Sequence, residues 1–411
     1  MKRPRVVVTG LGVVSSIGIG WKAFWDSLIQ GKSGIGEVAS FDTSQFQTHR
    51  GGEVKGFNPL NFIESSRLRR YNRASQFAIA ATKMAIQDAH LGSSREDGRR
   101  MGISIGTTMA EAQAIESMDS TWVQESVGRI HPRLIPQYPG NIIGAHVATE
   151  LKCIGPNLAI TTACAAGNYA LAYASDLLRL GKSDVMIAGG ADAFSRIAFM
   201  GFNRLLAVAP DMCQPFDRNR KGMMVGEGAG ILILERLEDA MARKAPIYAE
   251  ILGYGMSCDA THMTIPDVEG VKKVMLNGLK DAGIDRRDVD YINAHGTGTP
   301  ANDRTECAAI RSVFGNLTDH LPVSSIKSMI GHTMGAASAL EAIACVLAIQ
   351  SGTIPPTINF GEVDPGCDID CVPNISRAQR SQVVLNNSFA FGGNNACLVL
   401  SGYSNNVGIN G

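Results

Sequence analysis

Neither sign of charge is in excess in this chain of 411 residues, because Lys and Arg together number 38 and Asp and Glu also number 38. A balanced charge removes the electrostatic basis for bulk nucleic-acid binding. Aromatic residues are also scarce, at 6%, whereas hydrophobic residues make up 45% and glycine occupies 45 positions. This composition is typical of a compact globular protein with many tight turns. We therefore expect no nucleic-acid partner, and any role for basic residues to be local.

Long hydrophobic runs are missing as well. No stretch reaches the roughly 18 uninterrupted apolar residues that a membrane-spanning helix needs, so we expect no membrane span. The start, Met1-Lys2-Arg3-Pro4-Arg5 followed by Val6-Val7-Val8, superficially resembles a signal peptide. However, Gly10 and Gly12 interrupt the apolar stretch, and no clear small-residue cleavage site follows. We predict a first strand and its turn at this position.

Paired cysteines of the Cys-x-x-Cys type are absent. The chain has nine cysteines, an odd number, and the closest two are Cys367 and Cys371. This pattern argues against a disulfide framework and for a reducing compartment. We therefore expect a cytoplasmic protein.

Complete phosphate-binding loops are also lacking. Residues 8–15 (VTGLGVVS) begin like a dinucleotide-binding turn, but Ser15 stands where the third glycine is needed. The Gly-Lys-Ser segments at 31–33 and 181–183 lack the upstream glycine of a phosphate loop. We interpret all three segments as turns and expect no tightly bound nucleotide.

What the chain does contain is a regular alternation of short apolar runs and helical patterns. The patterns predict strands over 5–10, 101–106, 156–162, 184–189, 230–234, 247–253, 289–293, 322–325 and 397–401, and helices over 74–90, 165–180, 271–281 and 334–350. This recurrence predicts an α/β protein with mixed sheets. No linker separates two halves, so we place the boundary near 237–246 and expect tightly packed halves of residues 1–245 and 246–411.

Cys164 lies in the segment TTACAAG (161–167), between a predicted strand and a predicted helix. The small neighbouring residues leave its sulfur uncrowded. A thiol at a helix N-terminus experiences the positive end of the helix dipole, which is expected to lower its pKa and raise the thiolate fraction. Considered alone, Cys164 fits a buried, inert cysteine equally well.

Two histidine loops distinguish these alternatives. His295 lies between a predicted strand and the segment GTGTP, whose glycines let a ligand approach the backbone. His332 follows Gly331 and begins the predicted helix that includes Glu341, a position that favours a neutral, hydrogen-bond-donating ring. The other histidines lack such settings, which predicts surface or packing roles for His49, His90, His131, His146, His262 and His320.

The sequence contains candidates for two further kinds of site, a zinc centre and an oxyanion-binding turn. A zinc site built from Cys164, His295 and His332 is disfavoured, because the three residues include no short-range ligand pair. The turn Gly392-Gly393 precedes the last predicted strand, and its backbone N–H groups are candidates to bind an oxyanion.

Taken together, these segments resemble the elongating β-ketoacyl-acyl-carrier-protein synthases of the type I/II, KAS II-like group, within the thiolase superfamily. The resemblance covers essentially the whole chain and is carried by VVVTGLG (6–12), the Cys164 segment, PFD (215–217), GEGAG (226–230), HGTGT (295–299), KSMIGH (327–332) and FGG (391–393). It implies a duplicated, five-layered αβαβα fold. It also implies an acyl-carrier-protein partner, a phosphopantetheine arm supplied by that carrier, and a homodimer or a heterodimer with a related ketosynthase-like chain.

The resemblance also implies a reaction and its residues. The reaction is the decarboxylative condensation of an acyl group, held on Cys164, with malonyl-carrier, and His295 and His332 act on the malonyl unit. Lys327 and Glu341 support the site, and a structural monovalent cation is implied near Asn293, Glu341 and Asn387. The backbone amides of Cys164 and Phe391 form the oxyanion hole, with Phe391 as a gate beside Phe389. Substrate contacts are implied at Thr297 and Thr299 for the phosphopantetheine arm and at Phe202, Thr107, Thr108 and Met109 for the acyl chain. The implied docking residues for the carrier are Arg67, Arg69, Arg70, Arg73 and Arg220.

The chain departs from the usual pattern of housekeeping members. Ala165-Ala166 follows the cysteine in place of Thr-Ser, Ala390 replaces a glycine, Asn394 replaces a threonine, and Lys221 replaces an acidic residue. These departures bear on the substrate, the gate motion and the choice of partner. Ala390 beside the gate, together with Thr107, Thr108 and Met109 in the expected acyl tunnel, favours specialised fatty-acid or polyketide elongation over housekeeping lipid synthesis. Two rival functions are a cysteine hydrolase, which leaves one histidine unexplained, and a catalytically silent partner subunit that sets chain length. The presence of the cysteine and both histidines counts against the silent subunit.

Overall fold

Two strand units with the same connectivity form the framework of the computed structural model, which describes residues 3–92 and 100–403. The first unit contains β1 (Val6–Ser15), β5 (Met101–Gly106), β6 (Asn157–Ile160), β7 (Val185–Asp192) and β8 (Gly228–Arg236), in the spatial order β6-β5-β7-β8-β1. The second contains β9 (Ala249–Cys258), β10 (Tyr291–Asn293), β11 (Val323–Ser324), β14 (Val383–Phe389) and β15 (Asn394–Ser401), in the order β11-β10-β14-β15-β9.

The two units have the same strand order and the same strand directions. Each places its strands in the order third, second, fourth, fifth and first along the chain. In each, the first two pairings are parallel and the last two are antiparallel. The predicted duplication of the fold is therefore confirmed.

The units join where β1 pairs with β9. Val6, Val7 and Val8 lie antiparallel to the segment Ala249–Ile251, which makes one continuous sheet of 11 strands that includes the short β2 (Gly18–Ile19). All three valines are fully buried. This start of the chain is a central strand, although its first two residues lie outside the described part.

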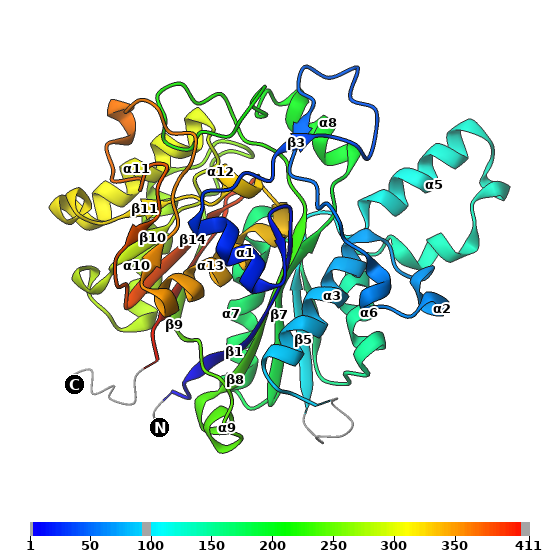
Figure 1. Cartoon of the computed structure of the whole chain (residues 1–411), viewed down its shortest axis with the longest axis horizontal. Coiled ribbons are helices and arrows are strands. Elements are labelled where there is room, and N and C mark those ends of the chain that lie inside the picture. Colours follow the sequence, from blue (N-terminus) through cyan, green and yellow to red (C-terminus); the bar gives the residue numbers. More distant parts are fainter. Residues whose placement is uncertain (1–2, 93–99, 404–411) are drawn as a thin grey trace.

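Helices complete the five layers (Figure 1). The outer helices are α3 (Arg73–Asp88) and α6 (Ile142–Leu151) on the first unit, and α10 (Val268–Ala282) with α11 (Pro300–Phe314) on the second. Between the units lie α7 (Ala166–Arg179) and α13 (Ala337–Ser351), each of which contacts strands of both. The predicted αβαβα architecture is confirmed, with α7 and α13 as the shared middle layer.

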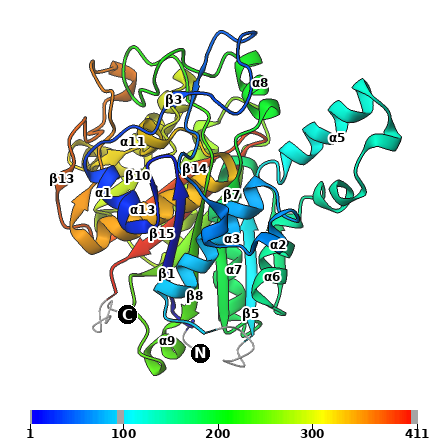
Figure 2. The same cartoon turned by 45° about the vertical axis from the view of Figure 1, so that its right-hand side comes forward.

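Shorter elements connect this framework. They are α1 (Trp21–Ile29), α2 (Ser65–Leu68), α5 (Ala112–Gln124), α8 (Arg196–Arg204), α9 (Leu237–Ala242), α12 (Lys327–Ile330), and the two-residue strands β3 (Gly36–Glu37), β4 (Arg50–Gly51), β12 (Thr353–Ile354) and β13 (Arg377–Ala378). Of these, α5 extends away from the body of the molecule (Figure 2).

The first strand is longer than predicted because its glycines serve packing and do not form a turn. A Cβ atom at Gly12 would lie 1.8 Å from the Ala81 carbonyl oxygen, and one at Gly10 would lie 2.3 Å from that of Ala85. Both carbonyls belong to α3, so the glycines let this helix lie directly on β1. Apolar periodicity does not reveal this close approach.

One segment among the described residues, Met334–Ser351, is long and apolar enough to cross a membrane, with a mean hydropathy of 1.5. In the fold, 83% of this segment is buried. It consists of a 3-10 turn, Met334–Ala336, followed by α13, which packs between the two strand units. Its apolar character is accounted for by that central position.

Candidate active site

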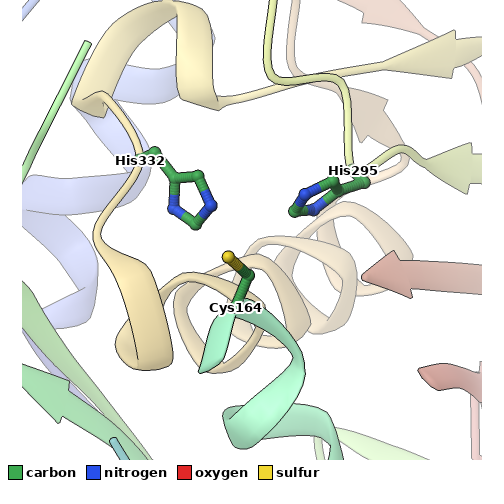
Figure 3. A group of neighbouring side chains, drawn as sticks. All are labelled: Cys164, His295 and His332. Atoms are coloured by element: carbon green, nitrogen blue, oxygen red, sulfur yellow. The ribbon is translucent and has the colours of Figure 1, made fainter. Parts of the chain in front are cut away.

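Cys164, His295 and His332 converge from three separate segments (Figure 3). Cys164 lies in the 3-10 turn Ala163–Ala165 before α7, His295 follows β10, and His332 follows α12. One ligand atom from each residue lies within 4.8 Å of the other two. The imidazole centroids are 5.5 Å apart with nearly perpendicular rings, and the sulfur points between them.

Strained or glycine-dependent backbone holds these loops in place. Ala163, directly before the cysteine, has a φ of 48°, in the left-handed region that a non-glycine residue rarely occupies. Gly296 and Gly331, which flank the two histidines, also have positive φ values, of 38° and 73°. Such backbone persists where surrounding contacts enforce it, and it concentrates at functional sites.

Hydrogen bonds fix the tautomer of both histidines. Nδ1 of His332 accepts from the backbone N–H of Met334 at 3.0 Å, and Nδ1 of His295 accepts from the Lys327 ammonium at 3.3 Å. An accepting Nδ1 leaves the proton of a neutral ring on Nε2. Burial, reinforced by the Lys327 charge, lowers the pKa of both rings well below the usual value. Both rings are therefore neutral Nε2–H donors.

The neutral state of His332 was predicted, but from a different cause. We expected the N-terminus of a helix to hold the ring neutral. In the structure, His332 precedes the 3-10 turn that leads into α13, and burial is the main cause of its lowered pKa.

The same hydrogen bonds argue against zinc. A zinc-bound histidine normally donates its second ring N–H to an acceptor. Here both Nδ1 atoms face donors, Met334 N–H and the Lys327 ammonium. Metal coordination at Nε2 would move a proton onto Nδ1 against these donors, so the arrangement does not fit a metal centre.

The Lys327 ammonium is the buried cation of the site. It bonds both His295 and Glu341 Oε1, and the side chains of Lys327 and Glu341 are fully buried. Burial raises the pKa of Glu341, and the Lys327 charge opposes that rise. Because each charge compensates the other, the ammonium can remain beside His295 without access to water.

The three residues of the implied cation site each have a buried oxygen atom with no hydrogen-bond partner among the described residues: Asn293 Oδ1, Glu341 Oε2 and Asn387 Oδ1. The amide nitrogen of Asn293 donates to Asn386, and that of Asn387 faces Met275 Sδ, so both amide oxygens remain available. Buried acceptors are rarely left unpaired. An all-oxygen donor set suits a hard cation, so these residues fit the monovalent cation that the resemblance implies.

The expected lowering of the Cys164 pKa is wrong. Burial raises the pKa of this thiol to about 11 and outweighs the opposing effects of Lys327 and of the backbone N–H groups of Cys164 and Phe391. The sulfur precedes α7, which begins at Ala166, and it is enclosed by the cavity wall. Desolvation of the thiolate therefore exceeds the stabilisation by the helix dipole.

Two backbone N–H groups hydrogen-bond the Cys164 sulfur and oppose the rise in its pKa. They belong to Cys164 and Phe391, which the resemblance implies as the donors of the oxyanion hole. The separate expectation that the Gly392-Gly393 turn supplies these donors is corrected. The N–H groups of Gly392 and Gly393 are already bonded, to the carbonyls of Met263 and Ala390. The glycine turn therefore positions the Phe391 amide and does not supply oxyanion donors itself.

A cavity with an empty volume of about 580 Å³ contains the triad and three of the six implied substrate contacts, Phe202, Thr297 and Thr299. Thr297 and Thr299 line it, with their hydroxyls 2.9 Å apart. Phe391 is 40% exposed at its wall, with its ring 5.9 Å from that of Phe202. Phe389 is buried, 5.6 Å from the His295 ring.

The implied acyl-chain contacts at 107–109 lie outside the lining of this cavity. The Thr107 hydroxyl is buried and donates to Asp192 at 2.7 Å, and the backbone N–H groups of Thr108 and Met109 also donate to Asp192. The Thr107 hydroxyl therefore bonds within the protein and does not face the acyl chain, which corrects the expected substrate contact of this side chain. Met109 packs against an apolar cluster that Phe202, which lines the cavity, also contacts.

Sequence reasoning missed parts of the site. Glu306 on α11 accepts from the backbone N–H groups of His295 and Gly296, both at 2.8 Å, and burial raises its pKa to about 7. The only sequence signal was an acidic residue early in a helix directly after the histidine loop. His262, which was assigned to surface or packing roles, lines the cavity mouth with Met263 and Thr264.

The five arginines predicted to dock a carrier differ in their exposure. Arg220 is only 1% exposed and lies between Asp303 and Asp364, so the expectation that it contacts a carrier is corrected. Arg73 binds the buried Glu227 and is 32% exposed, so its docking role stays a prediction. Arg67 pairs with Glu150 and Glu64. The remaining two share a surface hollow lined by Ser65, Ser66, Arg69, Arg70 and Arg133.

Comparison with known proteins identifies the family. Residues 3–240 match the N-terminal domain of β-ketoacyl synthases, and residues 248–361 match the C-terminal domain. The chain is 41% identical to 3-oxoacyl-acyl-carrier-protein synthase 2 of Synechocystis sp. (98% of this chain, 99% of the relative) and 40% identical to nodulation protein E of Rhizobium sp. strain N33 (96% and 98%).

Solved structures show the same relationship. The ishigamide ketosynthase/chain length factor superposes with a TM-score of 0.94 at 45% identity, covering 98% of this chain and 100% of that one. A type II polyketide ketosynthase in complex with its acyl-carrier protein superposes with a TM-score of 0.89 at 34% identity and the same coverage. The chain therefore belongs to the β-ketoacyl synthase family of condensing acyltransferases.

Proposed function

We propose that this protein extends a carrier-bound acyl chain by decarboxylative Claisen condensation, with Cys164 as the acyl acceptor and His295 and His332 as the donors that stabilise the malonyl-derived enolate. The convergence of one thiol and two neutral Nε2–H donors in a single cavity carries this proposal. A cysteine hydrolase needs a histidine that accepts the thiol proton. Both rings here present a donor to the cavity, which disfavours that alternative.

The first half-reaction transfers the acyl group. The Cys164 sulfur attacks the acyl thioester, and the backbone N–H groups of Cys164 and Phe391 stabilise the oxyanion of the tetrahedral intermediate. The carrier thiolate leaves and takes up the proton that Cys164 loses. Acyl-Cys164 and a free carrier thiol are the products.

The second half-reaction forms the carbon–carbon bond. The thioester carbonyl of malonyl-carrier accepts hydrogen bonds from Nε2–H of His295 and His332, so that loss of CO2 leaves a stabilised enolate. The enolate carbon attacks the acyl carbonyl on Cys164 and expels the Cys164 thiolate, which is then protonated. The product is 3-oxoacyl-carrier. Thr297 and Thr299 contact the phosphopantetheine arm that the carrier supplies, and no other organic cofactor is needed.

Partner binding is supported by two surfaces. The hollow lined by Arg69, Arg70 and Arg133 offers positive charge to an acidic acyl carrier protein. Among the described residues, strand β6 pairs only with β5 and forms an open sheet edge. The extended α5 presents Trp122 and Val123 at 64% and 77% exposure. Open edges and exposed apolar side chains favour a subunit partner, so we propose a homodimer or a heterodimer with a related chain.

The organisation and setting of the chain follow from the same proposal. The repeated topology supports a division into residues 1–245, which carry the nucleophile, and 246–411, which carry both histidines. The described cysteines are all free thiols, which supports a location in the cytoplasm.

The alanines at 165, 166 and 390 lie beside the nucleophile and the gate, and they favour a specialised elongation substrate over housekeeping synthesis.

Half-reaction assays test the proposal. Acylation is followed by mass spectrometry of the Cys164 peptide, and condensation by malonyl-dependent formation of 3-oxoacyl-carrier. Cys164→Ala is expected to abolish both while malonyl decarboxylation persists, and His295→Ala and His332→Ala are expected to lose decarboxylation while acylation survives. Malonyl-independent release of free acid would instead indicate a hydrolase, and an inert wild-type protein would indicate a silent subunit.

A further inference from the structure

Asp192, at the end of β7, is a buried carboxylate that none of the steps above uses. It accepts four hydrogen bonds: from Thr107 Oγ1 at 2.7 Å, Thr108 N at 2.8 Å, Met109 N at 3.2 Å and Gly335 N at 2.7 Å. Three of these donors belong to the turn after β5, and the fourth belongs to the 3-10 turn after His332. One carboxylate thus links a loop of the first strand unit to a catalytic loop of the second.

The turn that Asp192 holds is strained. Met334 has a φ of 54°, in the left-handed region, which is unfavourable for a side chain of this size. Its N–H donates to Nδ1 of His332, and the next N–H along the chain, that of Gly335, donates to Asp192. The same strained turn is therefore tied to the catalytic ring at one end and to the carboxylate at the other.

Close backbone packing makes this link stiff. A Cβ atom at Gly335 would lie 2.6 Å from Cα of Thr107, so the two loops are in direct contact. Burial raises the pKa of Asp192 to about 6, and its four hydrogen bonds oppose that rise. Hydrogen bonds to a charged carboxylate are stronger than those between neutral groups, which suits Asp192 to holding a strained peptide.

We propose that Asp192 is a positioning residue for decarboxylation: it holds the Met334–Gly335 turn so that Met334 N–H keeps His332 in the tautomer that donates from Nε2. The proposal rests on the proposed function, because it assigns Asp192 to the histidine-dependent half-reaction. Asp192 touches no reacting atom, and its effect passes through His332 alone.

Asp192→Asn tests this inference because it keeps the size of the side chain but turns one acceptor into a donor that faces N–H groups. We expect decarboxylation of malonyl-carrier to fall about 10²-fold, the scale of a misplacement of roughly 1 Å. Acylation of Cys164 should stay within about threefold of wild type. Asp88→Asn is the matched control, since Asp88 also accepts hydrogen bonds from three residues, Leu11 N, Trp21 Nε1 and the Tyr248 hydroxyl, and lies outside the cavity lining. It should leave the ratio of the two rates unchanged.

A double-mutant cycle separates positioning from general damage. In a His332→Gln background, whose amide keeps a donor and a measurable rate, Asp192→Asn should cause no further loss, because its route of action has been removed. A similar loss in both backgrounds, or an equal loss in both half-reactions, would overturn the inference.

A second variant covers the case in which Asp192→Asn does not fold. Thr107→Val preserves the side-chain shape and removes one of the four hydrogen bonds to Asp192, together with the bond that the Thr107 hydroxyl accepts from Ala110 N. Because three bonds to Asp192 remain, we expect a smaller loss confined to decarboxylation. Unchanged decarboxylation in Thr107→Val would then overturn the inference. A folded wild-type protein that does not decarboxylate malonyl-carrier would overturn the proposed function itself.

Discussion

The ammonium of Lys327 donates to Nδ1 of His295 across 3.3 Å, and its second bond is to Glu341. Burial lowers the pKa of the His295 ring and the Lys327 charge lowers it further, so the ring is neutral, and the bond to Nδ1 keeps its proton on Nε2. The ion pair is fully buried, so salt screens its contribution to the site much less than that of a surface pair.

Lys327→Met is therefore expected to lower both the rate of malonyl-carrier decarboxylation and the free energy of unfolding. Loss of the donor to Nδ1 frees the tautomer of His295, and decarboxylation should fall about 10²-fold, as when one oxyanion donor is removed. The unpaired Glu341 should destabilise the fold by about 3–5 kcal/mol, measured by urea unfolding. Lys327→Met/Glu341→Met should recover most of the stability but not the rate, and a double variant with wild-type decarboxylation would contradict this account.

The raised pKa of Cys164 predicts the pH dependence of its alkylation. The thiolate is the reactive form, so a pKa of about 11 means that the thiolate fraction at neutral pH is small and grows with pH. Alkylation of Cys164 by iodoacetamide, followed by mass spectrometry of its peptide, should rise about tenfold per pH unit from pH 7 to pH 10. Cys164→Ala gives the background from other thiols. A plateau below pH 8 would show that the thiol is activated in the free protein.

Carrier docking is expected to depend on Arg69 and Arg70. Arg69→Glu/Arg70→Glu should raise the KM for acyl-carrier at least about tenfold, and the effect should shrink at high salt, because the contact is electrostatic. The KM for a small acyl thioester should not change. Lys273→Glu/Lys280→Glu is the matched control, since it reverses two exposed charges on α10, on the outer face of the second unit. Equal effects of the two double variants would place docking elsewhere.

The gate turn predicts a specificity effect at Ala390. The Ala390 N–H donates to Asn394 O, and Gly393 N–H donates to Ala390 O, both at 3.0 Å, so this residue anchors the turn that carries Phe391. Ala390→Gly loosens the anchor by widening the accessible backbone conformations. We expect a shifted distribution of product chain lengths, or a changed ratio of acylation to condensation, with activity retained. An unchanged product profile together with equal rates on saturated acyl-carriers of many lengths would favour a housekeeping synthase.

The sequence singled out the three residues that meet in the cavity better than it predicted their surroundings. Cys164, His295 and His332 can be recognised in the sequence because each lies in a short glycine- or alanine-rich loop after a predicted strand. Such a loop is a local sequence pattern that does not depend on residues far along the chain. Strand β14 was not predicted, because Asn386 and Asn387 interrupt its apolar pattern. In the fold, Asn386 bonds Asn168 and Ser338, a long-range polar contact with no local signature.

The remaining errors concern burial. The pKa of Cys164 was expected to be lowered by a helix dipole, which a local pattern can indicate, but the cost of desolvation depends on residues far along the chain. Arg220 looked available for docking because its partners, Asp303 and Asp364, lie about 80 and 140 positions away in the sequence. Local charge therefore does not reveal whether a side chain reaches the surface.

The pairing of β1 with β9 has a consequence for how activity is lost. The nucleophile belongs to one copy of the repeated unit and both histidines belong to the other, so the chemistry exists only while the two copies keep their relative register. A small separation of β1 from β9 would move the Cys164 sulfur away from the two imidazoles by more than the condensation reaction tolerates. This separation would occur before either strand unit unfolds. The rate of condensation therefore reports on the contact between the two strand units more sensitively than helix content does. As denaturant is added, activity should be lost at a lower concentration than the one at which circular dichroism shows loss of helix.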